Sequence, residues 1–268
     1  MFTTGRIGSA AMDTGDRLSE RDRTSAPGRK ERSRFAVLRA RYARGRGSRR
    51  REAAWVAVLC LTGLAVVNGF VAQPFLVPSG SMDNTLRVGD RILVNKLAYR
   101  FGNQVRRGDV VVFDGTGSFV QEGEFPRPNP VAELFRKGAG LVGFARPGET
   151  DYTKRVIGIA GDRVTCCDKR GRIEVNGVAV DERGNLYPGD AASGVPFDIV
   201  VPEGKLFVLG DHRSRSRDSR DHLGEPGGGM VPVGKVIGRA DWIVWPLGRT
   251  GELKRPPGYT RVPDGAHG

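Results

Sequence analysis

The chain has 268 residues and a formal net charge of +13, with 43 Lys and Arg against 30 Asp and Glu. The basic excess is concentrated in residues 1–52, which hold 15 Lys and Arg but 6 Asp and Glu. Aromatic residues make up 7% of the chain, and residues 1–52 contain only Phe2, Phe35 and Tyr42. Nucleic-acid-binding surfaces combine basic with stacking aromatic side chains, so this composition argues against a nucleic-acid partner.

Residues 1–52 are rich in Arg, Ser, Gly and Asp and show no sustained apolar period, which predicts a disordered basic tail. The 19 residues from Ala53 to Val71 carry no charge and are long enough to cross a hydrocarbon core of about 30 Å as a helix. A buried core helix and a cleaved signal peptide are the alternatives. We favour a transmembrane helix over residues 53–72, because a signal peptide would not follow such a tail.

The Arg-rich stretch Arg39–Arg51 lies directly before the apolar segment. By the positive-inside rule it places the tail in the cytoplasm and the rest of the chain outside the membrane. We therefore expect a single-pass protein of the cell membrane with an extracytoplasmic domain over residues 73–248.

After Pro74 the pattern changes to short runs rich in Val, Ile and Phe, separated by Gly, Pro and Asp, which predicts a mainly β fold. The expected strands are Arg91–Val94, Val110–Phe113, Lys154–Ile159, Arg163–Cys167, Arg172–Val175, Lys205–Leu209, Lys235–Ile237 and Trp242–Trp245.

Three further segments are set apart by composition. Residues 116–150 form a long insertion rich in Gly, Pro, Glu and Phe, with a possible short helix at Val131–Lys137. Residues 168–204 alternate turns and brief strands and predict a small appended β subdomain. Residues 249–268 are polar and rich in Pro and Gly, which predicts a frayed C-terminal tail.

The three cysteines show no Cys/His spacing typical of zinc. Cys60 lies in the apolar segment, and Cys166 and Cys167 are adjacent. Neighbouring cysteines rarely bridge each other because the geometry strains the backbone. A structural role is expected, and pairing with each other or with a partner stays open.

The turn Pro78-Ser79-Gly80-Ser81-Met82 follows the apolar segment. A serine on a tight turn with small neighbours is a candidate nucleophile, although ordinary Ser/Gly turns are common. The histidines His212, His222 and His267 are weak candidates for its base. His267 lies in the tail, and the other two lie in a charged loop where a solvated surface role is expected.

Lysine can serve as a base when burial keeps it neutral. Strand alternation from Tyr152 to Ile159 puts Tyr152, Lys154, Val156 and Gly158 on one face. Lys154 is therefore either a buried base or an edge-strand lysine that discourages aggregation. The run Gly210–Arg220 alternates Ser, Arg and Asp, which indicates a solvated loop, a phosphate-binding patch or a set of groups that support the lysine.

These motifs, in this order behind an N-terminal anchor, resemble the type I signal peptidase family, the membrane-bound Ser/Lys endopeptidases. The strand Arg107–Phe113 also resembles that family. The resemblance implies a Ser/Lys-protease β fold and cleavage of signal peptides from exported preproteins after Ala-x-Ala-like ends. It implies no metal or cofactor, and we expect a monomer whose partners are preproteins and the lipid bilayer.

The resemblance also implies a role for individual residues. Ser81 would be the nucleophile and Lys154 the general base, with the oxyanion held by the Ser81 N–H and the Ser79 hydroxyl. Ser216 would hydrogen-bond the lysine, and Asp218 and Arg220 would brace the loop. The pockets for the substrate side chains at −1 and −3 would be lined by Phe75, Val77, Met82, Leu86, Tyr152 and Thr153.

The chain departs from the family pattern at His212, Ser214 and Arg215, where Asn, Asp and Asn are common, and at Thr153, where an aliphatic residue is usual. Two other functional classes stay open. Self-cleaving repressors share the Ser/Lys fold but carry a DNA-binding domain in place of a membrane helix. A membrane-tethered binding module would use the basic tail and would lose its activity on deletion of residues 1–50.

Overall fold

The structure is a computed structural model that describes residues 49–120, 148 and 150–265. The chain separates into two units, Met1–Val56 and Ala57–Gly268, and every described strand lies in the second. A helix runs over Arg49–Val71 and ends in the π-helical turn η1 (Val67–Val71). Only 6% of the most apolar 18-residue stretch of this helix is buried, so the alternative of a buried core helix is wrong. The predicted disordered tail, up to residue 48, lies outside the described residues.

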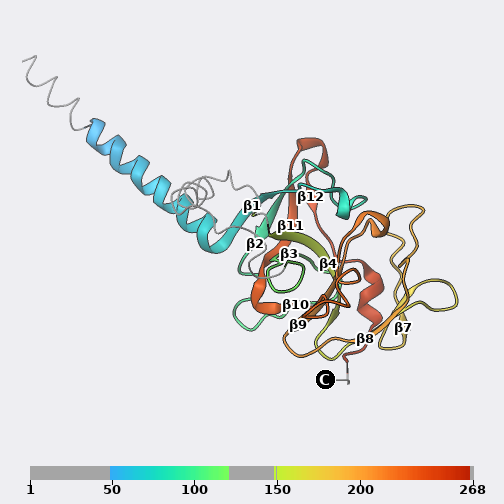
Figure 1. The fold of residues 1–268 in the computed structure, drawn as a ribbon. Helices are drawn as coiled ribbons and strands as arrows, with labels where there is room; N and C mark the ends of the chain where they lie inside the picture. Colours follow the sequence, from blue (N-terminus) through green and yellow to red (C-terminus); the bar gives the residue numbers. More distant parts are fainter. Residues whose placement is uncertain (1–48, 121–147, 149, 266–268) are drawn as a thin grey trace, which may run out of the picture. The chain divides into compact units, whose positions relative to one another are not determined.

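Among the described residues, eight strands form one antiparallel sheet in the order β1-β2-β11-β3-β4-β9-β10, with β12 paired to β11 (Figure 1). The strands are β1 (Ala72–Leu76), β2 (Arg91–Asn95), β3 (Val110–Asp114), β4 (Asp151–Ile159), β9 (Lys205–Leu209), β10 (Val231–Pro232), β11 (Val236–Trp245) and β12 (Gly251–Glu252). β4 lies between β3 and β9, so it is an interior strand.

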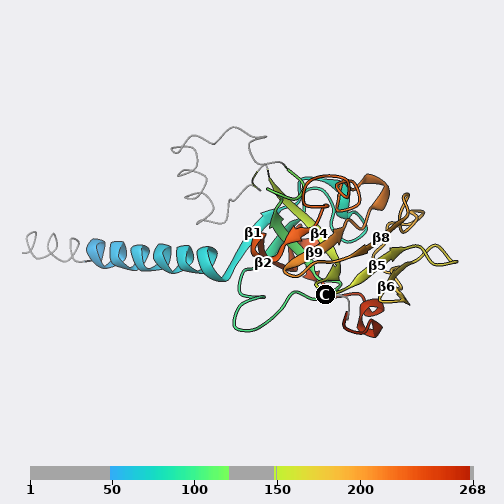
Figure 2. The same cartoon turned by 60° about the horizontal axis from the view of Figure 1, so that its bottom comes forward.

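A second antiparallel sheet has the order β7-β6-β5-β8, within the part of the chain that the structure describes (Figure 2). Its strands are β5 (Arg163–Cys166), β6 (Ile173–Val175), β7 (Val178–Ala179) and β8 (Phe197–Val200). The sheet starts before the predicted subdomain boundary at residue 168, since β5 follows β4 after a three-residue turn. At the end of β5, Cys166 and Cys167 form a disulfide with each other, while Cys60 is free.

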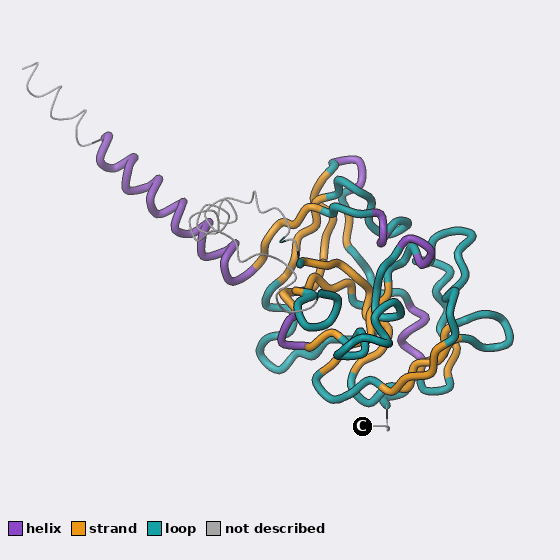
Figure 3. The backbone as a smooth tube through the Cα atoms, viewed as in Figure 1, coloured by secondary structure: helices purple, strands orange, loops and turns teal. Residues whose placement is uncertain are grey.

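Short 3₁₀ turns join several strands (Figure 3). They are η2 (Gly80–Met82), η3 (Arg213–Arg215), η4 (Val233–Lys235), η5 (Leu247–Arg249) and η6 (Pro257–Arg261). Of these, η2 and η3 contact each other, which brings the Ser81 turn to the charged Gly210–Arg220 loop.

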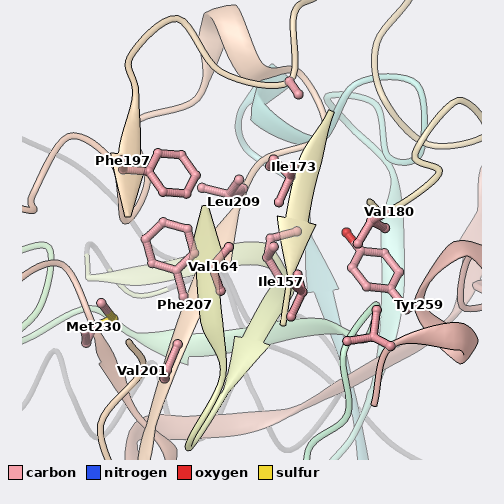
Figure 4. Close-up of a cluster of buried hydrophobic side chains, with 13 residues drawn as sticks. Ile157, Val164, Ile173, Val180, Phe197, Val201, Phe207, Leu209, Met230 and Tyr259 are labelled. Atoms are coloured by element: carbon pink, nitrogen blue, oxygen red, sulfur yellow. The ribbon is translucent and has the colours of Figure 1, made fainter. Parts of the chain in front are cut away.

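Three buried apolar clusters support the sheets. The first joins the two sheets, because Ile157 of β4 and Phe207 of β9 pack with Val164 of β5 and Phe197 of β8 (Figure 4). The second packs β1 and the Ser81 turn against β2 and β11. The third covers part of β3, β4 and β9. The mainly β fold predicted from sequence is therefore confirmed.

Two local expectations about the strands are wrong. Lys235–Ile237 and Trp242–Trp245 are not two strands, since β11 runs unbroken over Val236–Trp245 with register shifts, and Lys235 belongs to η4. The predicted shared face of Val156 and Gly158 is broken by a bulge between them in the pairing with β9. Accordingly Val156 packs in the third cluster, while Gly158 lies against Val164 of the first.

The predicted frayed tail after residue 248 is also wrong. β12 pairs with β11, and η6 buries Tyr259 in the first cluster. Apolar burial and backbone pairing hold this segment despite its Pro and Gly content, so we propose that the domain expected over residues 73–248 extends to at least residue 265. Most of the 116–150 insertion, including the possible helix at Val131–Lys137, lies outside the described residues.

Candidate active site

The Ser81 turn begins where β1 ends. Ser79 is extended, and Gly80, Ser81 and Met82 form η2. Gly80 lets the Asp83 carboxylate lie close to the turn, since a Cβ at this position would come within 2.6 Å of Asp83 Oδ2 and the Asp83 side chain would have to move. Met82 is fully buried in the second cluster and fixes the turn against β2 and β11. The Ser79 and Ser81 hydroxyl oxygens lie 3.4 Å apart, so the candidate oxyanion donor is beside the candidate nucleophile.

Lys154 lies in the middle of β4, opposite Val111 of β3, and is 3% exposed. The alternative of an edge-strand lysine is therefore wrong. Its Nζ donates a hydrogen bond of 2.9 Å to Ser216 Oγ, its hydrogen-bond partner among the described residues. A buried amine with one hydroxyl partner is poorly solvated, and poor solvation disfavours the charged form.

Burial lowers the pKa of Lys154 from 10.5 to about 8, although the negative charge of nearby Asp218 opposes part of this effect. Asp218 is itself fully buried. Burial alone would raise the pKa of Asp218, but hydrogen bonds and the charge of Arg220 hold it below its ordinary value. The site thus keeps a carboxylate charged near an amine that is readily neutral close to physiological pH.

Ser216, Asp218 and Arg220 lie on one braced loop. Arg220 binds Asp218 through both Nε and Nη2, each at 2.8 Å, which is the fork geometry of a bidentate pair. The amide of Gly210, at the start of the loop, donates to Asp218 Oδ2 at 3.0 Å. These bonds fix both ends of the segment that carries Ser216, so the hydroxyl reaches Lys154 from a rigid support.

Gly210 also brings the two serines together. A Cβ at this position would collide with Ser81 O on one side and with Ser216 Oγ on the other. The adjacent His212 amide donates to the Ser81 carbonyl at 3.1 Å. Ser81 and Ser216 are therefore neighbours at Gly210, and Lys154 joins them through its hydrogen bond to Ser216 Oγ, although the three residues come from distant parts of the chain.

A family model described as "Signal peptidase, peptidase S26" matches residues 50–245. The signal peptidase I of Mycobacterium tuberculosis (strain ATCC 25618 / H37Rv) is 39% identical over 225 residues, which cover 76% of this chain and 75% of the relative. The chain belongs to the signal peptidase I family. The probable signal peptidase I of Mycobacterium leprae (strain TN) is 36% identical over 234 residues, covering 76% of this chain and 80% of the relative. The crystal structure of a signal peptidase I from Enterococcus faecalis V583 is 24% identical and covers 51% of this chain and 97% of its own chain. Its TM-score of 0.31 is too low to describe a shared fold.

Enzymes of this family are serine endopeptidases that remove signal peptides from exported preproteins. The family, enzyme class and function predicted from sequence are confirmed, and the non-enzymatic binding module and the self-cleaving repressor are wrong. The apolar helix Arg49–Val71 supports membrane anchoring. No group of three or more His, Cys, Asp or Glu within the described residues is placed to hold a metal ion.

The six residues expected to line the signal-peptidase substrate pockets fall in two places. Phe75, Val77, Met82 and Leu86 are buried together in the second cluster, and Met82 belongs to the Ser81 turn itself. Tyr152 packs instead in the third cluster, with its ring 5.9 Å from Phe113 and 5.2 Å from Phe119. Thr153 lies between Tyr152 and Lys154 on β4 and is partly exposed.

The expectation that His212 and His222 are solvated is wrong. The His212 ring stacks on Tyr187 with centroids 3.8 Å apart, and its Nδ1 lies 3.6 Å from Asp83 Oδ2. His222 Nδ1 lies 2.8 Å from Glu225 Oε2, and both histidines are buried. The other departures from the family pattern, Ser214 and Arg215, are exposed. Aromatic stacking buries residues that their charged neighbours in sequence suggested would be solvated.

Sequence reasoning missed the ion pair of Arg155 and Asp211. Arg155 Nε and Nη2 bind the two Asp211 oxygens at 2.8 and 2.6 Å, and both side chains are buried. The pair ties β4, directly after Lys154, to the residue directly after Gly210. The sequence did carry a signal for this pair. Arg155 follows Lys154 and Asp211 follows Gly210, and these two segments were expected to meet at the site.

Replacing Gly210 by alanine is expected to lower preprotein cleavage by about 100-fold, because the new methyl group must displace Ser81 O or Ser216 Oγ. Steady-state cleavage by the purified, detergent-solubilised variant measures the loss. Gly194→Ala is the matched control, since a Cβ there meets nothing within 4 Å and the backbone has no positive φ. Equal activity of the two variants would contradict the proposed role of Gly210.

Proposed function

We propose that Ser81 is the nucleophile and Lys154 the general base of this signal peptidase. The observation that carries the proposal is the burial of Lys154, which is 3% exposed and whose amine is held by Ser216 in a site that also contains the Ser81 turn. Neutral Lys154 takes the proton of the Ser81 hydroxyl as its oxygen attacks the scissile carbonyl. The oxyanion accepts hydrogen bonds from the Ser81 amide and the Ser79 hydroxyl.

The tetrahedral intermediate collapses when the scissile C–N bond breaks, and protonated Lys154 gives its proton to the departing amine of the mature protein. The signal peptide then remains as an ester on Ser81. Neutral Lys154 next takes a proton from water, which attacks the ester and releases the signal peptide with a free carboxylate. One lysine serves as base and acid in turn, and the Ser81 hydroxyl is restored.

Ser216, Asp218 and Arg220 would support this cycle without touching the reacting bond. Ser216 orients the amine through its 2.9 Å hydrogen bond, and the Asp218–Arg220 pair holds the loop that carries Ser216. The three groups and the dyad come from one chain, which supports action as a monomer. A light-scattering mass of an active dimer in detergent would contradict this part of the proposal.

We propose that the preprotein binds as an extended strand beside the Ser81 turn, with its small side chains at −1 and −3 facing an apolar floor. Phe75, Val77, Met82 and Leu86, which are buried in the second cluster beside the Ser81 turn, would supply that floor. Tyr152 and Thr153 would contact the substrate from β4. Because Thr153 carries a hydroxyl, we expect a −3 preference for Ala over larger aliphatic residues, and equal cleavage of Ala and Leu at −3 would contradict it.

We propose that the Arg49–Val71 helix spans the cell membrane with the basic tail in the cytoplasm and the catalytic domain outside. Trp242 and Trp245 are not core residues, since they are 49% and 51% exposed. Indole rings prefer the membrane interface, so these two residues fit a surface resting on the bilayer. Protease added to intact spheroplasts should degrade the catalytic domain and spare the tail, and the reverse pattern would overturn the orientation.

The pH dependence of kcat/KM tests the proposed base. Because the pKa of Lys154 is lowered to about 8, its neutral, active fraction should fall about tenfold per pH unit below 8 and level off above it. Cleavage of a peptide spanning an Ala-x-Ala site, measured from pH 6 to 10, gives the profile. A rising limb near 6.5 would indicate a histidine base instead.

A further inference from the structure

The chain continues past the family match, which ends at residue 245. We call residues 251–265 the C-terminal strap, because they are fastened to both sheets. The fastening bonds are Leu253 N to Asp241 O at 2.8 Å, Arg107 Nη1 to Val262 O at 3.3 Å, Asn176 Nδ2 to Pro263 O at 2.9 Å, and Arg255 Nε to Asp109 Oδ1. A segment held by so many partners is part of the folded domain.

Tyr259 is the strap residue that reaches furthest into the protein. It is buried in the first cluster, close to Val180 (Figure 4), and its hydroxyl donates to Glu182 Oε1 at 2.6 Å. The preceding Gly258 lies directly on the Asp181 backbone, where a Cβ would come within 2.9 Å of the Asp181 amide. Two independent contacts thus press the strap onto the residues at and before Glu182.

Glu182 connects Tyr259 to the Gly210–Arg220 loop through hydrogen bonds. The same Oε1 accepts a 2.6 Å bond from Arg213 Nη2, and the Glu182 and Arg213 side chains are both buried. Arg213 in turn donates through Nε to Gly210 O at 2.8 Å and through Nη1 to Ala192 O at 2.6 Å. The guanidinium is planar and has fixed donor directions, so its orientation determines where the Gly210 carbonyl lies.

Gly210 is the point at which this chain of bonds meets the reacting groups. Its carbonyl is held by Arg213 and its amide by Asp218, and both Ser81 O and Ser216 Oγ lie close to the position that a Cβ would take. A shift of Gly210 would move the Ser216 hydroxyl, which holds Lys154, relative to the Ser81 turn. Catalysis tolerates little displacement of such groups, since about 1 Å can cost about 100-fold in rate.

We propose that Tyr259 is a positioning residue for catalysis and acts through Glu182 and Arg213 on Gly210. This inference rests on the proposed Ser81/Lys154 function and adds a residue that lies outside the family match. The phenol hydroxyl and Arg213 share one buried carboxylate oxygen, where no water can replace a lost donor without opening the core. Removing the hydroxyl therefore loosens Glu182, and with it the direction of the Arg213 fork.

The test compares Tyr259→Phe with Tyr99→Phe in the full-length, detergent-solubilised enzyme. Both substitutions remove one hydroxyl that donates to a buried carboxylate, since Tyr99 donates to Asp109 Oδ2 at 3.0 Å. Tyr259→Phe is expected to lower kcat about tenfold with KM unchanged. Tyr99→Phe is expected to keep kcat within twofold. A kcat for Tyr259→Phe that matches Tyr99→Phe, after correction for folded fraction, would overturn the proposal.

A double-mutant cycle tests the route through Glu182. The losses in kcat of Tyr259→Phe and Glu182→Gln should combine to less than their product, because both act on the same bond. In a second cycle, Tyr99→Phe is combined with Glu182→Gln, and the losses in kcat should multiply. If the losses multiply in both cycles, the proposed route through Glu182 is refuted. Ser81→Ala distinguishes a failure of the positioning role from a failure of the proposed function. A Ser81→Ala enzyme that still cleaves would refute the dyad. A fully active Tyr259→Phe enzyme would refute only the positioning role of Tyr259.

Discussion

Replacing Lys154 by methionine is expected to lower cleavage by at least about 1,000-fold while making the folded protein more stable at pH 7. The activity is lost because methionine cannot accept the Ser81 proton. The stability is gained because an amine whose native pKa is lowered from 10.5 to about 8 costs free energy when buried with its charge. That shift corresponds to an upper bound of about 3 kcal/mol, and loss of the bond to Ser216 offsets about 1 kcal/mol of it.

The pH dependence of this gain has a definite sign. Below pH 8 the lysine is protonated in both the folded and unfolded states, so the full cost of burial is present. Between pH 8 and 10.5 only the unfolded state binds the proton, and the wild type gains stability relative to the variant. Thermal melts followed by circular dichroism should show a higher Tm for Lys154→Met at pH 7, and the difference should disappear above pH 10.5.

Two further variants make this result specific. Ser81→Ala should lose activity to the same extent without the pH-dependent gain in Tm, because it removes no buried charge. His212→Gln should keep most of its activity, since the His212 contact to Ser81 runs through the backbone amide. A Lys154→Met enzyme with wild-type cleavage would end the Ser/Lys proposal, and an inactive His212→Gln would point to a histidine base.

Asp211→Asn is expected to destabilise the protein by about 3–5 kcal/mol, because it leaves the buried Arg155 guanidinium without its counter-charge. Asparagine has nearly the same shape as aspartate, so the loss reports charge rather than a cavity. For a domain of this size, the fall in Tm is about 6–20 °C. Melts of the full-length protein in detergent measure it, and activity should fall in parallel as the folded fraction is lost.

The chain offers a matched control for this prediction. Arg163 and Asp198 form a pair with the same bidentate geometry, at 2.8 and 2.5 Å, but their side chains are 53% and 51% exposed. Solvent screens an exposed pair, so Asp198→Asn should leave Tm nearly unchanged. Equal shifts for Asp211→Asn and Asp198→Asn would contradict the claim that burial makes the Arg155 pair essential.

The parts of this molecule that sequence predicted best depend on local patterns. Lys205–Leu209 is a strand with the predicted bounds, because a short continuous run of apolar residues between turn signals is typical of a buried strand. The pairing of Lys154 with Ser216 was also accessible, since a lysine on a buried strand and a hydroxyl-rich loop after another strand are motifs that resemble one family.

The parts that sequence missed depend on contacts between distant segments. His212 looked solvated among charged neighbours, yet Tyr187, from a loop beside the second sheet, covers its ring. The segment after residue 248 looked frayed because Pro and Gly suppress periodicity, whereas it is Tyr259 and its partner Glu182 that hold it. No pattern within either segment indicates which remote side chain it will meet.

The titration of the Lys154 amine itself tests the central claim most directly. The chain has eight lysines, so 13C labelling at Cε gives a small set of signals, and Lys154→Met identifies the one that belongs to residue 154. We predict that this signal titrates near pH 8 in the wild type and in Ser81→Ala, because burial lowers its pKa. A Lys154 signal that titrates above pH 10 would show a solvated, charged amine and would contradict the proposed base.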